Sequence, residues 1–345
     1  MKKLFLIVLT LGLLASCESK KKEIKDQETV KKPVLTELQT KAKGIFGELP
    51  LVADNKENPV TEEKVALGKA LYFDTILSKN KTQSCNTCHN LDTYGVDNLP
   101  VSPGDKKGTF GGRNSPTTLN AALHISQFWD GREPDVEAQS GGPVLNPVEM
   151  GMSSEKEVEE RLSEVEKYQK MFAKAFPADK EAISYNNMKK AIGAFERKLL
   201  TPSKFDDYLA GDDNSMNKLE KEGLVLFMDK GCIACHAGNA LGGNIYQKFG
   251  IYADYWTLTK SEKIDKGRFD VTKNEADMYV FKSQSLRNIA KTYPYFHDGS
   301  VGELEEAVKI MGKIQLNIDF TESEVKALVA YLNTLTGEIP VELKS

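Results

Sequence analysis

The chain has 345 residues, of which 40% are hydrophobic and 28% are charged, and its formal net charge at pH 7 is −4. This length predicts about two domains, and the apolar content is sufficient for ordinary globular cores. The mildly negative charge gives no indication of nucleic-acid binding.

The first 34 residues predict export and tethering. Residues 1–16 contain Lys2, Lys3 and an apolar run too short to span a bilayer, which is typical of a signal peptide. The run ends in a sequence that resembles a lipobox, so Cys17 is predicted to be the acylated N-terminus; an ordinary signal peptide with an incidental cysteine is the alternative. Residues 17–34 are mostly polar and predict a flexible tether. The expected location is the periplasm, with a lipid anchor in a bacterial membrane.

Two segments far apart in the chain share one pattern. Residues 61–73 predict an amphipathic helix with acidic residues in its first turn, and residues 216–228 predict a second amphipathic helix. Each is followed by a short loop, a cysteine pair with a histidine, and a glycine-rich segment. This succession predicts an internal repeat.

Further helices are predicted by their start and stop signals. A capping box at Ser154 predicts a helix through about Ala175, and another helix is expected over 186–200. Later capping boxes predict helices over 300–312 and 321–335. Strand periodicity is weak.

The two cysteine pairs are the strongest motifs. Cys85-Asn86-Thr87-Cys88-His89 and Cys232-Ile233-Ala234-Cys235-His236 both have the spacing of covalent haem attachment, in which two thiols bind the haem and the histidine ligates its iron. A redox dithiol or a zinc site is the alternative for a CxxC pair. Only four histidines occur in the chain, and chance would rarely place one directly after both pairs. We therefore predict two haem c groups.

The fold class predicted from these elements is mostly α, with two cytochrome c-like haem domains and long loops around the haems. The turn-rich residues 201–215 predict the domain boundary. The N-terminal domain is expected over 35–205 and the C-terminal domain over 206–345, with the last helix able to pack back on the first domain.

The group opposite each histidine decides the chemistry of its haem. A histidine and a methionine together make a stable electron-transfer centre, whereas a histidine alone leaves a site for a small oxidant. Met311 follows the second motif at the predicted end of a helix, where it could ligate the second iron. Core packing is the other interpretation of such a methionine.

From about Leu35 to Gly337 the chain resembles the bacterial di-haem cytochrome c peroxidases, a family that includes the methylamine-utilisation di-haem enzymes. Three of the segments that carry the resemblance follow the first haem motif and three follow the second; they are Gly112–Thr117, Phe128–Arg132, Gly141–Met150, Phe281–Lys282, Ser285–Asn288 and Pro294–Gly299. The resemblance implies reduction of hydrogen peroxide with electrons from a small cytochrome c or a cupredoxin. It also implies a possible homodimer.

The resemblance assigns roles by position. The haem on His89 would be the peroxidatic one, with Gln139 and Glu149 in its distal pocket and the Glu149 carboxyl as a proton shuttle. Trp129 would lie between the two haems and carry electrons, although a lone tryptophan is more often core. Met311 would be the sixth ligand of the haem on His236.

A calcium ion between the domains is also implied by the resemblance. Asn114 and the backbone carbonyls of Thr292 and Pro294 are at the matching positions, and oxygen donors suit this hard cation. For the remaining histidines, we expect His297 to make hydrogen bonds near the second haem and His124 to be packed or exposed.

One residue departs from the family pattern. Many members carry a distal histidine about sixteen residues after the first haem motif, and this histidine blocks the peroxidatic iron until the other haem is reduced. Asp105 occupies that place here, and no histidine lies between His89 and His124. We therefore hypothesise that the peroxidatic site is open in the oxidised protein, unless another residue of this loop or a displaced His124 covers it.

The sequence thus predicts a lipid-anchored periplasmic peroxidase. Two other classes of protein are compatible with the two haem motifs. A non-enzymatic di-haem electron carrier would have both irons permanently six-coordinate, which Gln139 and Glu149 argue against. A di-haem oxidase of the methylamine-utilisation type would act on a protein or organic substrate, and Met311 argues against it because that subgroup has tyrosine there.

Overall fold

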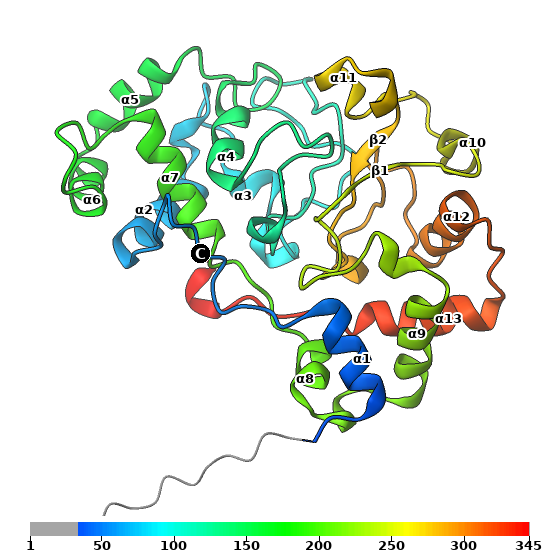
Figure 1. Cartoon of the computed structure of the whole chain (residues 1–345). Coiled ribbons are helices and arrows are strands. Elements are labelled where there is room, and N and C mark those ends of the chain that lie inside the picture. Colours follow the sequence, from blue (N-terminus) through cyan, green and yellow to red (C-terminus); the bar gives the residue numbers. More distant parts are fainter. Residues whose placement is uncertain (1–33, 345) are drawn as a thin grey trace, which may run out of the picture. The chain divides into compact units, whose positions relative to one another are not determined.

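Helices make up most of the regular structure (Figure 1). The structure, a computed structural model, describes residues 34–344, and residues from Leu35 onward form one unit. The signal peptide, most of the tether and Cys17 lie outside the described residues. Within residues 34–344, no helix is both long enough and apolar enough to cross a membrane.

The predicted mostly α fold is confirmed. The α-helices are α1 Glu37–Phe46, α2 Glu62–Phe73, α3 Cys85–Cys88, α4 Val136–Leu145, α5 Glu155–Ser163, α6 Glu166–Ala175, α7 Tyr185–Glu196, α8 Lys204–Ala210, α9 Lys218–Asp229, α10 Tyr255–Thr259, α11 Phe269–Thr272, α12 Leu304–Leu316 and α13 Glu322–Asn333. Single 3₁₀ turns are η1 Thr75–Leu77, η2 Leu91–Thr93, η3 Ala121–Leu123, η4 Asp213–Ser215, η5 Cys232–Ala234, η6 Glu275–Asp277, η7 Ile289–Lys291 and η8 Val341–Leu343. Strands β1 Tyr246–Lys248 and β2 Val280–Lys282 pair antiparallel, with Tyr246 opposite Lys282.

Two helix pairs cross in the same way. A methyl group on Gly68 of α2 would lie 1.9 Å from the carbonyl oxygen of Ala191 on α7, and one on Gly223 of α9 would lie 1.9 Å from that of Ala327 on α13. Glycine therefore allows each pair of backbones to meet directly. The same crossing before both haem motifs supports the predicted internal repeat.

The pairs lie on opposite sides of the unit, with α2, α5, α6 and α7 on one side and α9, α12 and α13 on the other (Figure 1). Each side has its own apolar core. Phe46 of α1 packs against Phe205 in the core of the second side, while Ile339 and Leu343 near the C-terminus pack in a third cluster with Tyr72 of α2. Segments near both ends thus pack on the side distant from them in sequence. The predicted spans 35–205 and 206–345 are called the first and second modules, and the boundary between them stays a prediction.

Several predicted helix starts are observed. The side chain of Thr61 accepts a hydrogen bond from Lys64 N at the start of α2, and Thr321 forms a capping box with Glu324 at the start of α13. Ser154 caps α5 through Glu157 N. These caps satisfy backbone N–H groups that lack partners within the helix.

Two predicted helices are corrected. The segment 154–175 forms two helices, α5 and α6, because Val165 is extended and its side chain packs against the core of the first side. The helix expected to end at Gly312 begins after Glu303 and runs to Leu316. Gly312 does not stop it because the ring of Phe320 packs directly on this glycine. Met311 therefore lies inside α12.

Candidate active site

The first haem motif is arranged by one turn of helix. Cys85 and Cys88 begin and end α3, and the backbone N–H of His89 donates to the carbonyl of Cys85 at 2.9 Å. The buried Tyr72 hydroxyl donates to the carbonyl of His89 at 2.6 Å. Both thiols and the imidazole are thus presented from one turn that α2 holds in place.

A cavity of about 820 Å³ opens at this turn. Cys85, Cys88 and His89 line it together with Gln139 of α4 and Glu149 from the loop after α4. Burial raises the pKa of Glu149, although Arg132 and a hydrogen bond from Asn146 oppose the shift. The structure therefore brings together the histidine, the amide and the carboxyl that the sequence assigned to one pocket.

The second motif has the same local form. Cys232 begins η5, and the backbone N–H of His236 donates to the carbonyl of Cys232 at 3.0 Å. The Nδ1 atom of His236 lies 3.2 Å from the carbonyl oxygen of Leu241. A hydrogen bond there fixes the tautomer and leaves Nε2 as the ligating atom.

A second cavity, of about 320 Å³, is lined by Cys232, Cys235 and His236 and also by Met311 of α12. Its walls are mostly apolar and include Phe227, Phe249, Leu304 and Leu328. A histidine and a methionine thus line one apolar cavity, as a six-coordinate haem requires. The volumes of both cavities fall in the range of cofactor sites, roughly 300–1,000 Å³.

The donor groups fit haem c better than the alternatives for a CxxC pair. Burial raises the pKa of the thiol to about 12 for Cys85, about 11 for Cys88 and about 11 for Cys232, and it also raises that of Cys235. A redox dithiol needs a thiol of lowered pKa, which this burial disfavours. Cavities of about 820 and 320 Å³ are also far larger than a single zinc ion needs. Burial also lowers the pKa of His89 and of His236, so both imidazoles are neutral, as iron ligation requires.

Trp129 and His297 line both cavities. Their rings meet edge to face with centroids 6.2 Å apart. The indole N–H of Trp129 donates to the carbonyl of Asn114 at 2.9 Å, and the Trp129 carbonyl accepts from the backbone N–H of Lys282 at 2.8 Å. Trp129 is therefore held from both modules at the wall between the cavities.

The hydrogen bond expected for His297 is not seen at its Nε2 atom, which is buried and has no hydrogen-bond partner among residues 34–344. The ring instead stacks on Phe281, with centroids 4.6 Å apart. No sequence signal placed His297 against both cavities, because this position depends on contacts between distant loops.

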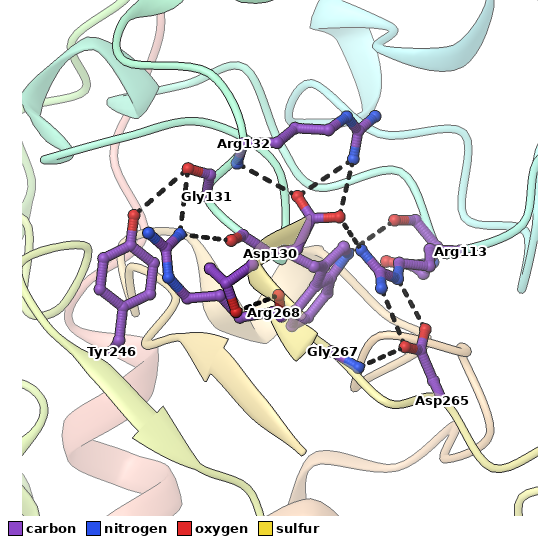
Figure 2. A network of polar contacts seen from close by, with 11 residues as sticks. Arg113, Asp130, Gly131, Arg132, Tyr246, Asp265, Gly267 and Arg268 are labelled. Atoms are coloured by element: carbon purple, nitrogen blue, oxygen red, sulfur yellow. Dashed lines mark hydrogen bonds and ion pairs between the residues drawn. The ribbon is translucent and has the colours of Figure 1, made fainter. Parts of the chain in front are cut away.

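An ion-pair network joins the two modules beside the first cavity (Figure 2). Arg113 donates to both carboxylate oxygens of Asp265, at 2.6 and 2.8 Å, and to Asp130 at 2.6 Å. Arg132 also binds Asp130, while Arg268 donates to the Asp130 carbonyl and lies over the ring of Tyr246. Asp265 and its neighbours Lys263, Ile264 and Lys266 line the first cavity. Sequence reasoning missed Asp265, since nothing local distinguishes it from other surface aspartates.

Asp105 turns away from the first cavity. Its carboxylate accepts from Asn80 Nδ2 at 2.6 Å and from Thr82 Oγ1 at 2.7 Å, and it is not among the residues that line the cavity. His124 is also elsewhere, with its Nδ1 3.0 Å from Lys282 Nζ. Among residues 34–344, the histidines that line the first cavity are His89 and His297.

The residues assigned to calcium lie in neighbouring loops. The side-chain amide of Asn114 donates to the carbonyl of Leu99 at 2.9 Å. The amide of Asn98 donates to the carbonyls of Lys291 and Tyr293, which flank Thr292. The carbonyls of Thr292 and Pro294 therefore belong to a loop that Asn98 joins to the segment containing Leu99.

Comparisons with known proteins agree with this arrangement. The family model described as di-haem cytochrome c peroxidase matches residues 62–214, and the cytochrome c model matches residues 220–336. The cytochrome c551 peroxidase of Pseudomonas aeruginosa is 45% identical over 309 residues, covering 88% of this chain and 87% of the relative. The cytochrome c551 peroxidase of Nitrosomonas europaea is 46% identical over 283 residues, covering 82% of each chain.

A solved structure is similar over most of its length. It is a MauG-like protein associated with microbial copper homeostasis, with a TM-score of 0.78 and 30% identity, and the match covers 87% of this chain and 97% of that one.

Proposed function

Because this chain belongs to the di-haem cytochrome c peroxidase family, we propose that its two cavities divide one reaction between them. The chain is an oxidoreductase that reduces hydrogen peroxide with electrons from a cytochrome, and it carries two haem c groups. Peroxide is reduced in the first cavity, and electrons enter at the second. The observation that carries this division is the placement of Gln139 and Glu149 in the cavity of His89, while Met311 lies in that of His236.

When bound, the haems supply the electrons that break the oxygen–oxygen bond of peroxide. The protein supplies proton transfer: the reaction takes up two electrons and two protons and releases two waters. The Glu149 carboxylate accepts a proton from one peroxide oxygen and returns it to the other, which leaves as water. The Gln139 amide donates a hydrogen bond that orients the peroxide. The raised pKa of Glu149 suits a group that must both accept and release a proton.

His236 and Met311 would both ligate the iron of the second haem, a ligand pair that raises the reduction potential. Trp129 would provide the electron path, since its ring lies in the wall common to both cavities. The donor would be a small cytochrome c or a cupredoxin.

The decisive experiment measures peroxide turnover with a reduced small cytochrome c as donor, comparing fully oxidised protein with protein reduced by one electron. We expect equal activity without a lag, because Asp105 is bound to Asn80 and Thr82 and does not enter the cavity. Activity only after reduction would contradict the open site but keep the peroxidase function. No turnover in either state, with both haems present, would favour an electron carrier.

We also propose that calcium binds between the modules, through the side-chain oxygen of Asn114 and the carbonyls of Thr292 and Pro294. Calcium takes six to eight oxygen ligands, so water would complete the site. Metal analysis of the purified protein should find calcium, and a chelator should lower activity that added calcium restores. Full activity in metal-free protein would contradict this proposal.

The proposed location is the periplasm, with lipid attached at Cys17. The anchor would be supported if the wild-type peroxidase activity is found in the membrane fraction and the Cys17→Ser activity is found in the soluble fraction. Release of wild-type protein without detergent would contradict it.

We also propose a homodimer, which sedimentation of the purified protein would test. The two-domain division at residues 205 and 206 is a further proposal, and limited proteolysis near 201–215 would test it.

A further inference from the structure

The buried lysine on strand β2 has no role in the reaction described above. Lys282 is 3% exposed, and its ammonium group donates to His124 Nδ1 at 3.0 Å and to the Ser126 carbonyl at 2.8 Å. Both acceptors belong to the first module, whereas Lys282 belongs to the second. The side chain therefore crosses between the modules.

The Lys282 amine is not paired with a carboxylate. Among residues 34–344, Lys282 forms no ion pair, and both of its acceptors are uncharged groups. The charge of Asp130 acts on it, but Arg113 and Arg132 already bind that carboxylate. A buried ammonium without a counter-ion is costly, so this amine holds its proton less tightly than an exposed lysine does.

His124 is positioned to accept the hydrogen bond from the Lys282 amine at its Nδ1 atom. Burial and the Lys282 charge lower the pKa of His124 well below its usual value, so the imidazole is neutral. Its ring packs on Gly243, where an added methyl group would lie 2.2 Å from the ring. The Nε2 atom is buried and has no hydrogen-bond partner in the described part of the chain. The ring is thereby fixed with Nδ1 toward the amine.

Lys282 and His124 lie next to the second cavity and Trp129, which are the two parts of the proposed electron path. Lys282 lines the cavity of the second haem motif, and its backbone N–H binds the carbonyl of Trp129. An electron that arrives at the second haem adds a negative charge to a poorly solvated region. In such a region a nearby charge shifts the proton affinity of a base strongly.

We propose that Lys282 and His124 form a proton-binding site coupled to reduction of the second haem. The cytochrome donor loses one electron, the second haem gains it, and the Lys282 amine takes up one proton from solvent to form a new N–H bond. His124 Nδ1 and the Ser126 carbonyl stabilise the resulting ammonium. This inference rests on the proposed role of the second cavity as the electron-entry site.

The proton affinity of the amine agrees with this role. Burial lowers the pKa of Lys282 to about 7, with Asp130 opposing the shift, so the amine can gain or lose a proton near neutral pH. Of the other charged or titratable groups, Asp130 of the first module acts on the amine and is itself bound by Arg113 and Arg132. From the second module, Tyr246 is paired with Lys282 in the sheet and has Arg268 over its ring, and His236 and His297 line the same cavity as Lys282.

The test is a potentiometric titration of the haem-loaded protein, followed by absorbance, at pH values on both sides of 7. In the wild type, the potential of the second haem should fall as pH rises, because reduction then requires proton uptake. Lys282→Met should lower the potential and abolish this slope. Lys282→Arg should abolish the slope but keep the potential high, since arginine stays charged. Lys248→Met is the control, because this lysine of β1 is exposed, and it should behave as the wild type.

If Lys282→Met does not fold, the variant His124→Leu and a direct measurement of proton uptake test the same proposal. His124→Leu removes one acceptor of the charged amine, so the midpoint of the pH dependence should move to lower pH. In weakly buffered solution with an indicator dye, reduction of the second haem should take up a proton in the wild type. A wild type without a slope, a Lys282→Met protein with the wild-type slope, or an unmoved midpoint in His124→Leu would overturn the proposal. Loss of peroxide turnover with the slope intact would instead count against the proposed function.

Discussion

Asp105 and Glu149 are joined by one backbone hydrogen bond, yet the pKa values of their carboxyl groups are shifted in opposite directions. The backbone N–H of Asp105 donates to the carbonyl of Glu149 at 2.7 Å. Burial raises the pKa of Glu149, which lines the cavity. Burial also acts to raise the pKa of Asp105, but hydrogen bonds from Thr82 and Asn80 outweigh it and lower the pKa. Neighbouring groups, rather than residue type, thus separate the proposed proton shuttle from a structural anchor.

The substitution Glu149→Gln tests the shuttle. Because an amide cannot transfer the proton, we expect kcat for peroxide to fall by about 10²- to 10⁴-fold, the range of general acid–base catalysis. In the wild type the free carboxylate accepts the first proton, so kcat/KM should fall as pH decreases through the pKa of Glu149. That decrease should occur above the ordinary glutamate pKa of about 4.3. Steady-state kinetics over a pH series would measure both effects.

Glu160→Gln is the matched control, since Glu160 is an exposed glutamate of α5 with 63% of its side chain accessible. It should leave kcat and the pH profile unchanged. Wild-type kcat in Glu149→Gln would remove this residue from the mechanism.

Asp105→Ala tests the anchor. The loss of its hydrogen bonds to Asn80 and Thr82 should lower the free energy of unfolding by about 2–4 kcal/mol, because one hydrogen bond to a charged group contributes about 1.5–3 kcal/mol and bonds that share a partner do not add in full. Peroxide binding to the oxidised protein should persist. Urea unfolding followed by circular dichroism would measure the change, with the exposed Asp92→Ala as a control. A loss of peroxide binding at unchanged stability would show that Asp105 acts in the cavity.

Helix starts that depend on local capping residues were predicted correctly from the sequence. The starts of α2 and α13 depend on residues three positions apart, and such caps can be read from the chain. The break between α5 and α6 and the continuation of α12 through Gly312 depend on packing by Val165 and Phe320. Those contacts involve the tertiary structure, so sequence patterns alone gave the wrong ends.

The glycine crossings provide a prediction at this scale. Gly68→Ala would place a methyl group 1.9 Å from the Ala191 carbonyl, and Gly223→Ala would do the same at Ala327. Each pair of helices must then separate, which should lower the free energy of unfolding by about 1–3 kcal/mol, as overpacking does. The two costs should be similar if the helix pairs are repeats.

Gly44→Ala in α1 is the control, because nothing lies within 4 Å of an added methyl group there. Alanine should stabilise that helix by up to about 1 kcal/mol. Thermal or urea unfolding of the three variants would measure these differences. Stability gained in all three would show that α2 and α9 do not approach their partners this closely.

For the whole molecule, the contacts between the modules could not be predicted from the sequence. Both haem motifs, Met311 and the pocket residues were found by motif spacing or by resemblance. Arg113 and Asp265 are 152 positions apart, and no local signal pairs them. The same holds for Lys282 and His124, which are 158 positions apart. Charged residues are common on any surface, so only the folded chain shows which of them meet.

Asp265→Asn tests whether the Arg113 pair joins the modules. The pair is bidentate and largely buried, with 18% and 16% of the two side chains accessible. Removing one charge should lower the free energy of unfolding by about 1–3 kcal/mol, and Arg113 would keep its contact with Asp130. Glu322→Gln breaks the exposed pair with Lys309 and should cost less than about 1 kcal/mol.

The pH dependence separates a true ion pair from a packing effect. Burial acts to raise the pKa of Asp265, but the hydrogen bonds and charge of Arg113 outweigh it and lower the pKa. A lowered pKa stabilises the folded state above the ordinary aspartate pKa of about 3.9, and this contribution is lost as pH falls through the folded pKa. The stability difference between wild type and Asp265→Asn should therefore be constant near neutral pH and shrink only in acid. A difference that does not change with pH would assign the effect to packing, and the segment 263–266 would then be held at the wall of the first cavity without help from charge.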